Sequence, residues 1–213
     1  MTRRFVLMAT LALAWMIGFP HMTFAAAQES VPACASALWL APLVGTPAVG
    51  DAAQAPVAED APPWLTIELT DACSGETFAL SDFTGKTVYV EAMATWCPPC
   101  RDQLARVHEA TAQLPEAERE EIVIVVLSSE VDLPREALAE YAASNDFPFI
   151  FAVMPVAMLQ TMAEDLGQEI AVPPAMPHLI VAPDGTIGEL HTGTASPEEL
   201  LTLFAEAQEA AGS

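Results

Sequence analysis

The chain has 213 residues, of which 53% are hydrophobic, and 29 acidic residues against 7 basic ones give a formal net charge of −22. This length and hydrophobic content suffice for one domain with a sizeable core. The acidic excess repels a phosphate backbone and argues against nucleic acid as a partner. We interpret most of the acidic residues as a solvated surface; the alternative is electrostatic attraction of a basic partner protein.

Residues 1–27 have the pattern of a signal peptide. Arg3 and Arg4 form a short basic region, residues 5–19 are uncharged and mostly apolar, and the small residues 25–27 suit a signal peptidase. The alternative is an uncleaved membrane anchor, because the apolar stretch is long enough to span a bilayer. Both alternatives predict a periplasmic or other extracytoplasmic location, where disulfides persist.

Residues 28–62 are rich in alanine and proline, carry few charges and show no clean period. The repeated prolines interrupt any helix or strand. We therefore predict a linker over 28–62 and a folded domain over residues 63–213.

Beyond the linker, hydrophobic patterns predict alternating strands and helices. Two short alternating stretches around residues 73–75 predict a β-hairpin, and the continuous apolar run 122–127 is typical of a parallel strand that is buried on both faces. The predicted strands are 66–69, 77–80, 87–93, 122–127, 147–153, 179–182 and 186–191; the predicted helices are 101–113, 135–144, 156–166 and one that begins at Pro197 after a Ser196 cap. This order predicts an α/β fold, a central mixed β-sheet flanked by helices with an N-terminal β-hairpin extension.

The motif Trp96-Cys97-Pro98-Pro99-Cys100 lies between a predicted strand and a predicted helix. At a helix N-terminus, unpaired backbone N–H groups and the helix dipole favour a thiolate, and hence redox chemistry. A structural zinc site needs a second pair of ligands, but the other cysteines, Cys34 and Cys73, are far apart in the sequence. Covalent haem attachment needs a histidine where Arg101 stands. We therefore predict no metal and no cofactor.

The two cysteines of the motif are predicted to have different roles. Cys97 is the expected attacking nucleophile, exposed at the helix N-terminus with a pKa below that of a free thiol. Cys100, one helical turn further on, is the expected resolving thiol that releases the partner. Pro98 and Pro99 remove two N–H donors that could stabilise a thiolate, which predicts a less oxidising pair. A permanent stabilising disulfide is the alternative, although so small a ring constrains the unfolded chain little.

Three segments resemble one known family. Residues 80–86 (LSDFTGK) precede a predicted strand, residues 94–101 (ATWCPPCR) contain the cysteine pair, and residues 176–185 (MPHLIVAPDG) hold a proline, a strand and an Asp-Gly turn. From Trp64 to the C-terminus, the chain resembles the thioredoxin superfamily, specifically its TlpA/ResA-like branch of extracytoplasmic thiol–disulfide oxidoreductases. The resemblance implies a thioredoxin-like fold.

The resemblance also implies roles for residues outside the motif. Glu91 corresponds to an acidic residue under the resolving cysteine, where a buried carboxylate with a raised pKa accepts the thiol proton. An outward-facing Glu91 is the alternative. Pro177 corresponds to the family's cis-proline beside the disulfide, and the backbone of the residue before it would pair with an extended substrate. The expected substrate contacts are Trp96, Met176, Pro98 and Pro99.

Together these observations predict an exported thiol–disulfide oxidoreductase that reduces disulfides of partner proteins through the Cys97/Cys100 dithiol. The resemblance implies apocytochrome c, in cytochrome c maturation, or copper-site proteins as substrates, and a membrane thiol reductase as electron donor. The alternatives are a disulfide oxidase or isomerase with the same site, or a non-catalytic thioredoxin-fold binding module. Cys34 and Cys73 either form a second disulfide or leave Cys73 as a free or third redox thiol.

Overall fold

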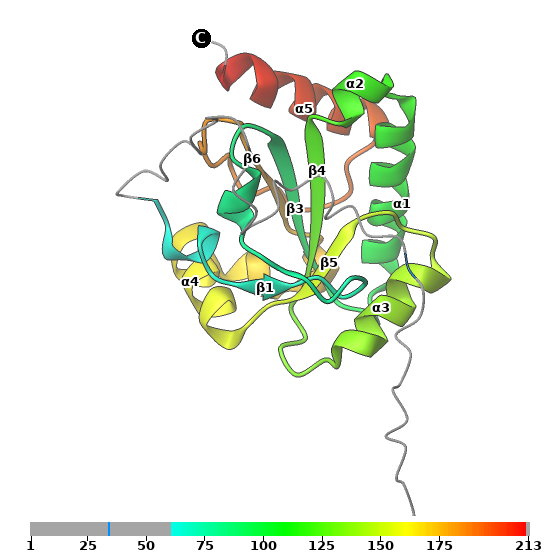
Figure 1. Ribbon diagram of the computed structural model, residues 1–213, viewed down its shortest axis with the longest axis vertical. Helices are drawn as coiled ribbons and strands as arrows, with labels where there is room; N and C mark the ends of the chain where they lie inside the picture. The colour runs from blue at the N-terminus through cyan, green and yellow to red at the C-terminus, as the bar shows by residue number, and fades with distance from the viewer. Residues whose placement is uncertain (1–33, 35–60, 212–213) are drawn as a thin grey trace, which may run out of the picture. The chain divides into compact units, whose positions relative to one another are not determined.

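The computed structural model describes residue 34 and residues 61–211 (Figure 1). The predicted signal peptide at 1–27 lies outside the described residues, as does the predicted linker at 28–62 apart from Cys34, Ala61 and Pro62. Within the described part of the chain, no helix is long and apolar enough to cross a membrane. Residues 61–211 belong to one unit of the fold, and a disulfide joins Cys34 to them.

A four-stranded β-sheet in the order β5-β4-β3-β6 forms the centre of this unit. The strands are β3 (Thr87–Met93), β4 (Ile122–Ser128), β5 (Ile150–Val153) and β6 (His178–Val181). β3, β4 and β5 are parallel, and β6 is antiparallel to β3. Every residue of β3 and β4 is buried, because helices cover both faces of the sheet. The predicted central mixed sheet is confirmed.

The alternating side chains of β3 divide the core into two parts. Tyr89 and Met93 point to one face of the sheet, and Val88 and Val90 point to the other. The first face is covered by α1 (Pro98–Gln113), α3 (Arg135–Ser144) and α5 (Pro197–Ala211), and the second by α4 (Val156–Leu166), η2 (Pro63–Leu65) and η3 (Leu80–Phe83) (Figure 1). Short helices also occur at α2 (Glu116–Arg119), η4 (Gln168–Ala171) and η5 (Pro173–Ala175). α3 and α4 begin and end where the sequence predicts.

The N-terminal β-hairpin is shorter than predicted. β1 (Leu69–Thr70) and β2 (Thr77–Phe78) are two residues long. The chain bends at 66–67 before β1, and the 3-10 turn η3 begins at Leu80 after β2. The connection between them lies along β5, where the Ala72 N–H donates to the Phe151 carbonyl at 2.6 Å. The buried Asp71 carboxylate accepts the Ser74 N–H at 2.7 Å and the Phe151 N–H at 3.4 Å. These bonds attach the hairpin to the edge of the main sheet.

Two strand predictions differ from the structure in extent. β5 begins at Ile150 and not at residue 147, because Pro148 has no N–H for the ladder. The segment 186–191 pairs with β6 only at isolated bridges, Val181 with Ile187 and His178 with His191. Gly188 lies between these bridges, and a Cβ on it would stand 3.0 Å from the Ile180 carbonyl oxygen. The close approach of the two backbones therefore requires glycine there.

Candidate active site

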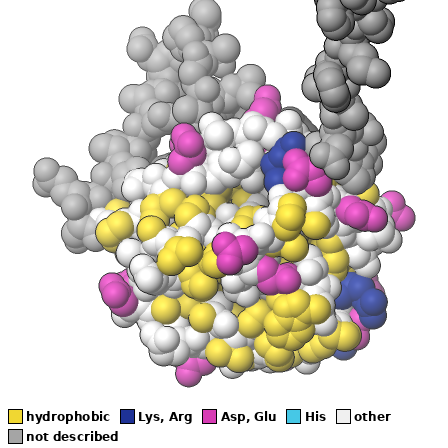
Figure 2. Space-filling view, turned by 90° about the horizontal axis from the view of Figure 1, so that it is seen from below, with side chains coloured by type: hydrophobic (Ala, Val, Ile, Leu, Met, Phe, Trp, Pro, Cys, Tyr) yellow, Lys and Arg dark blue, Asp and Glu magenta, His cyan; other side chains and the backbone are white. Residues whose placement is uncertain are grey.

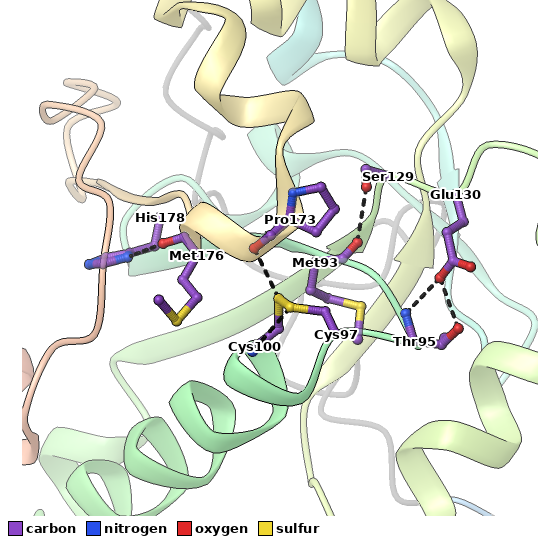
Figure 3. Close-up of a disulfide and its surroundings, with 9 residues drawn as sticks. All are labelled: Met93, Thr95, Cys97, Cys100, Ser129, Glu130, Pro173, Met176 and His178. Atoms are coloured by element: carbon purple, nitrogen blue, oxygen red, sulfur yellow. Dashed lines mark hydrogen bonds between the residues drawn. A yellow bond between two sulfur atoms is a disulfide. The ribbon is translucent and has the colours of Figure 1, made fainter.

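The cysteine pair lies where β3 ends and α1 begins (Figure 3). α1 starts three residues earlier than predicted, because Cys97 caps the helix and Pro98 and Pro99 suit its first positions. Cys97 and Cys100 form a disulfide with a Cα–Cα distance of 5.4 Å. The Cys100 N–H donates to Cys97 Sγ at 3.3 Å, and neither proline has an N–H to add.

Cys97 is buried, and the prediction that it is exposed is wrong. Only 2% of the residue is accessible, whereas its neighbour Trp96 is 61% exposed. The Cys97 sulfur turns inward because it is bonded to the buried Cys100 and packs in the core beneath α1. A hollow of about 320 Å³ reaches this position, lined by Thr95, Trp96, Cys97, Pro98, Arg101, Tyr141, Ser144 and Asn145. The hollow therefore borders the more exposed side of the disulfide.

Exposed apolar side chains surround the same end of the sheet. Trp96 follows β3, Val156 follows β5 and Val172 precedes the antiparallel β6, so all three lie at the carboxyl ends of the parallel strands. Figure 2 views the domain from this end: hydrophobic side chains cover much of the face, with more acidic than basic side chains around them. An apolar surface beside a disulfide fits contact with a partner protein.

The chain that precedes β6 passes over Cys100. The Pro173 carbonyl oxygen lies 3.0 Å from Cys100 Sγ (Figure 3), so the Cys100 thiol of the reduced protein has an acceptor there. The predicted cis-proline is wrong, because no peptide bond among the described residues is cis. The chain turns instead at Met176, whose φ of 50° and ψ of 56° are left-handed. The buried Pro177 accepts the Ala92 N–H at 3.0 Å, which aligns the chain with β3.

Both backbone groups of Met176 make hydrogen bonds within the protein, and the pairing of this residue with substrate stays a prediction. Its N–H donates to the Pro173 carbonyl at 2.8 Å, and its carbonyl oxygen lies 2.9 Å from Nδ1 of His178, which donates to it. The His178 ring is buried between Tyr89 and His191, at centroid distances of 5.6 and 5.7 Å. Burial lowers the pKa of His178. A neutral His178 therefore fixes the turn at Met176, whose side chain packs against the core around the cysteines.

Glu91 is fully buried, so the outward-facing alternative is wrong. Its Oε2 accepts the Tyr89 hydroxyl at 2.8 Å, and its Oε1 has no hydrogen-bond partner in the described structure. Burial raises the pKa of Glu91 to about 8, against the opposing effect of the Tyr89 hydrogen bond. A carboxyl group with this pKa exchanges protons near neutral pH. Proton transfer between Glu91 and Cys100 stays a prediction.

The sequence analysis missed three polar residues at this site. Oε2 of Glu130 accepts both the N–H and the hydroxyl of Thr95, at 2.6 and 2.9 Å. Gln103 is buried, and its Oε1 accepts the Ala195 N–H at 3.0 Å. Tyr141 lines the hollow; its buried hydroxyl has no partner among the described residues, and burial raises its pKa to about 12. The position of Glu130 directly after a buried strand could have indicated a site residue. Gln103 and Tyr141 stand in ordinary helical patterns, which give no such indication.

A second disulfide joins Cys34 to Cys73, which are 39 positions apart in the sequence, with a Cα–Cα distance of 5.4 Å. Cys73 lies in the connection between β1 and β2, and both cysteines are half-buried. Arg135 of α3 holds the same connection by donating to the Ala72 carbonyl at 3.2 Å. Of the two alternatives for these cysteines, the structure contains the disulfide.

Comparison with known proteins agrees with this geometry. A model of the family described as Redoxin matches residues 48–202. The chain belongs to the Redoxin family. A solved thiol:disulfide interchange protein of the thioredoxin family from Chlorobium tepidum is similar to it, with 15% identity over 66% of this chain and 92% of the other and a TM-score of 0.53. A secreted Mycobacterium tuberculosis disulfide oxidoreductase homologous to E. coli DsbE has 17% identity over 67% and 96% and a TM-score of 0.51. Redoxin membership and this shared fold confirm the predicted thioredoxin superfamily.

Proposed function

We propose that the protein is an exported reductant that reduces disulfides of partner proteins through the Cys97/Cys100 dithiol. The observation that carries the proposal is the start of α1, where the two prolines leave the Cys100 N–H as the helix donor to Cys97 Sγ. A thiolate with few donors is stabilised little. Because the reduced form then gains little from thiolate stabilisation, the pair gives up its electrons more readily.

The exchange reaction proceeds in two balanced steps. The Cys97 thiolate attacks one sulfur of the partner's disulfide, which forms a mixed disulfide and releases the other partner sulfur as a thiolate that takes a proton from water. The deprotonated Cys100 then attacks Cys97 Sγ, and the bond between Cys97 and the partner breaks. The second partner sulfur also leaves as a thiolate and takes a proton from water, so the partner ends with two thiols. Two electrons have passed to it from the protein, which now holds the Cys97–Cys100 disulfide.

The scheme assigns the proton of Cys100 to two groups. The Pro173 carbonyl, 3.0 Å from Cys100 Sγ, accepts the S–H of the reduced protein and so favours the neutral thiol. Burial raises the pKa of Glu91 to about 8, and in this scheme the ionised form of Glu91 accepts the proton when Cys100 attacks, directly or through a water molecule.

The partner and the location are part of the proposal. The signal-like segment 1–27 supports export, and the similar Mycobacterium tuberculosis protein is secreted. The net charge of −22 attracts a basic partner, and the exposed Trp96 offers it an apolar contact beside the disulfide. Apocytochrome c and copper-site proteins are the proposed substrates, and a membrane thiol reductase is the proposed electron donor.

The reduction potential of Cys97/Cys100 tests the proposal. The protein, purified after export by an expression host, is equilibrated in defined thiol buffers, trapped and analysed by mass spectrometry. A potential near about −270 mV is expected, and one near about −120 mV would mark an oxidase and overturn the proposed direction. Insulin-disulfide reduction, measured beside the Cys97→Ser variant, separates an enzyme from a non-catalytic binding module, for which the two proteins would behave alike.

A further inference from the structure

A carboxylate from a distant part of the chain is attached to the turn that precedes Cys97. Glu130 stands 35 positions after Thr95, and its Oε2 accepts the Thr95 N–H at 2.6 Å and the Thr95 hydroxyl at 2.9 Å (Figure 3). A single Glu130 oxygen thus accepts hydrogen bonds from both donors of Thr95. A group that accepts two such bonds and donates none fits the ionised form of the carboxyl group.

The loop that carries Glu130 is itself held against the end of β3. The N–H and the hydroxyl of Ser129 both donate to the Met93 carbonyl, at 2.9 and 3.2 Å. The Glu130 N–H donates to the Ser128 hydroxyl at 3.2 Å. Because neighbouring residues of the loop make these bonds, the carboxylate is fixed relative to the turn before Cys97.

The Glu130 carboxylate is bonded to a residue that stands two positions before the reacting sulfur. Thr95 precedes Cys97 by two residues, so their Cα atoms are at most about 7 Å apart. Over a separation on the order of 10 Å near a protein surface, a negative charge disfavours a second one by roughly three- to tenfold in an equilibrium constant. The carboxylate therefore opposes the formation of a thiolate at Cys97.

We propose that Glu130 is a positioning residue of the thiol–disulfide site, which fixes the turn before Cys97 through Thr95 and holds back thiolate formation at Cys97 by its charge. The inference rests on the proposed function, because it concerns the nucleophile of that exchange reaction. The charge of Glu130 makes the Cys97/Cys100 pair more reducing, and this effect does not depend on Pro98 and Pro99.

Other titratable and charged groups lie on the elements around Cys97. On the elements packed around it these are Tyr89 and Glu91 on β3, Arg101 and Asp102 on α1, Tyr141 on α3 and His178 on β6. All of them stay in place when only Glu130 is replaced. Their effects therefore cancel when two proteins that differ at this position are compared at equal pH and salt.

The Glu130→Gln variant of the full chain separates the charge from the hydrogen bonds, because the amide oxygen still accepts both Thr95 donors. The measurement is the rate of Cys97 alkylation by iodoacetamide from pH 5 to 10 in the reduced protein, with the modified cysteine assigned by mass spectrometry. We expect the variant's profile to move to lower pH by about three- to tenfold in the acid constant of Cys97. At high pH, where both proteins carry the thiolate, the equilibrium with glutathione should shift toward the reduced form by the same factor.

Two further variants decide how the result is interpreted. Glu109→Gln removes the same charge from an exposed position further along α1, and its profile should match the wild type. Glu130→Ala removes charge and bonds together, and we expect the same shift as for Glu130→Gln with a lower melting temperature. A Glu130→Gln profile that superimposes on the wild type would overturn the proposal, as would an equal shift in Glu109→Gln. A wild-type potential typical of an oxidase would refute the proposed function and still leave the difference between the two proteins measurable.

Discussion

The two disulfides span the same Cα–Cα distance of 5.4 Å in contrasting surroundings. Cys97–Cys100 joins positions three apart at a helix N-terminus and is buried, whereas Cys34–Cys73 joins positions 39 apart and is half-buried. A three-position ring constrains the unfolded chain little, but the longer loop contributes up to about 4 kcal/mol. The distance between the backbones is therefore the same in both disulfides. Loop length and surroundings make Cys97–Cys100 suited to exchange and Cys34–Cys73 suited to stabilising the fold.

Removal of the attacking sulfur should have the largest effect on activity and little effect on stability. Cys97→Ser is expected to lower the rate of insulin-disulfide reduction by about a thousandfold or more, because a serine hydroxyl forms no disulfide and is not ionised at neutral pH. Its melting temperature should change little, since the lost ring is small. A large fall in the melting temperature would mean that this disulfide also stabilises the fold.

Removal of the second disulfide should give the opposite result. The double variant Cys34→Ala with Cys73→Ala is expected to lose up to about 4 kcal/mol in free energy of unfolding, measured by urea denaturation. Its rate of insulin reduction should stay within about twofold of the wild type, because neither sulfur takes part in the proposed exchange. A substantial loss of activity at unchanged stability would assign this pair a redox role.

A donor restored at the start of α1 should make the reactive disulfide more oxidising. Pro99→His adds a backbone N–H and an imidazole near Cys97, which should shift the equilibrium with glutathione about tenfold, or about 30 mV, toward the reduced form. Pro115→His, at an exposed position beyond the far end of α1, is the matched control and should leave the equilibrium unchanged. An unchanged or lower potential in Pro99→His would contradict the role assigned to the prolines.

Glu91→Gln should have the smallest effect on activity, a several-fold slower exchange, because proton transfer is one part of the second step.

The same variant should also differ from the wild type in how its stability depends on pH. Between pH 4.5 and about 8 the folded protein keeps a proton on Glu91 that the unfolded chain releases. Stability is therefore lost as pH rises, by up to about 1.4 kcal/mol per unit. Melting temperatures from pH 5 to 9 should fall more in the wild type than in Glu91→Gln, and parallel curves would refute a buried, titrating Glu91.

The sequence best predicts the strands and helices whose positions depend on a local hydrophobic pattern. β3 over 87–93 and the helices α3 and α4 match because each carries an uninterrupted pattern between prolines or turns. The errors arise from contacts between distant segments. The burial of Cys97 depends on core packing around its disulfide, and the turn at Met176 depends on its bonds to Pro173 and His178. Glu130 was missed because its partner Thr95 stands 35 positions away.

The β-hairpin and the segment after β6 cover both edges of the main sheet. Asp71 and Ala72 occupy the edge of β5, and Ile187 and His191 occupy the edge of β6. Uncovered edges have unpaired N–H and C=O groups that recruit strands from other molecules and lead to aggregation. Because Cys34–Cys73 fastens the connection that covers β5, a reducing compartment would loosen this cover. We therefore expect the protein to resist aggregation better while this disulfide is intact than after its reduction.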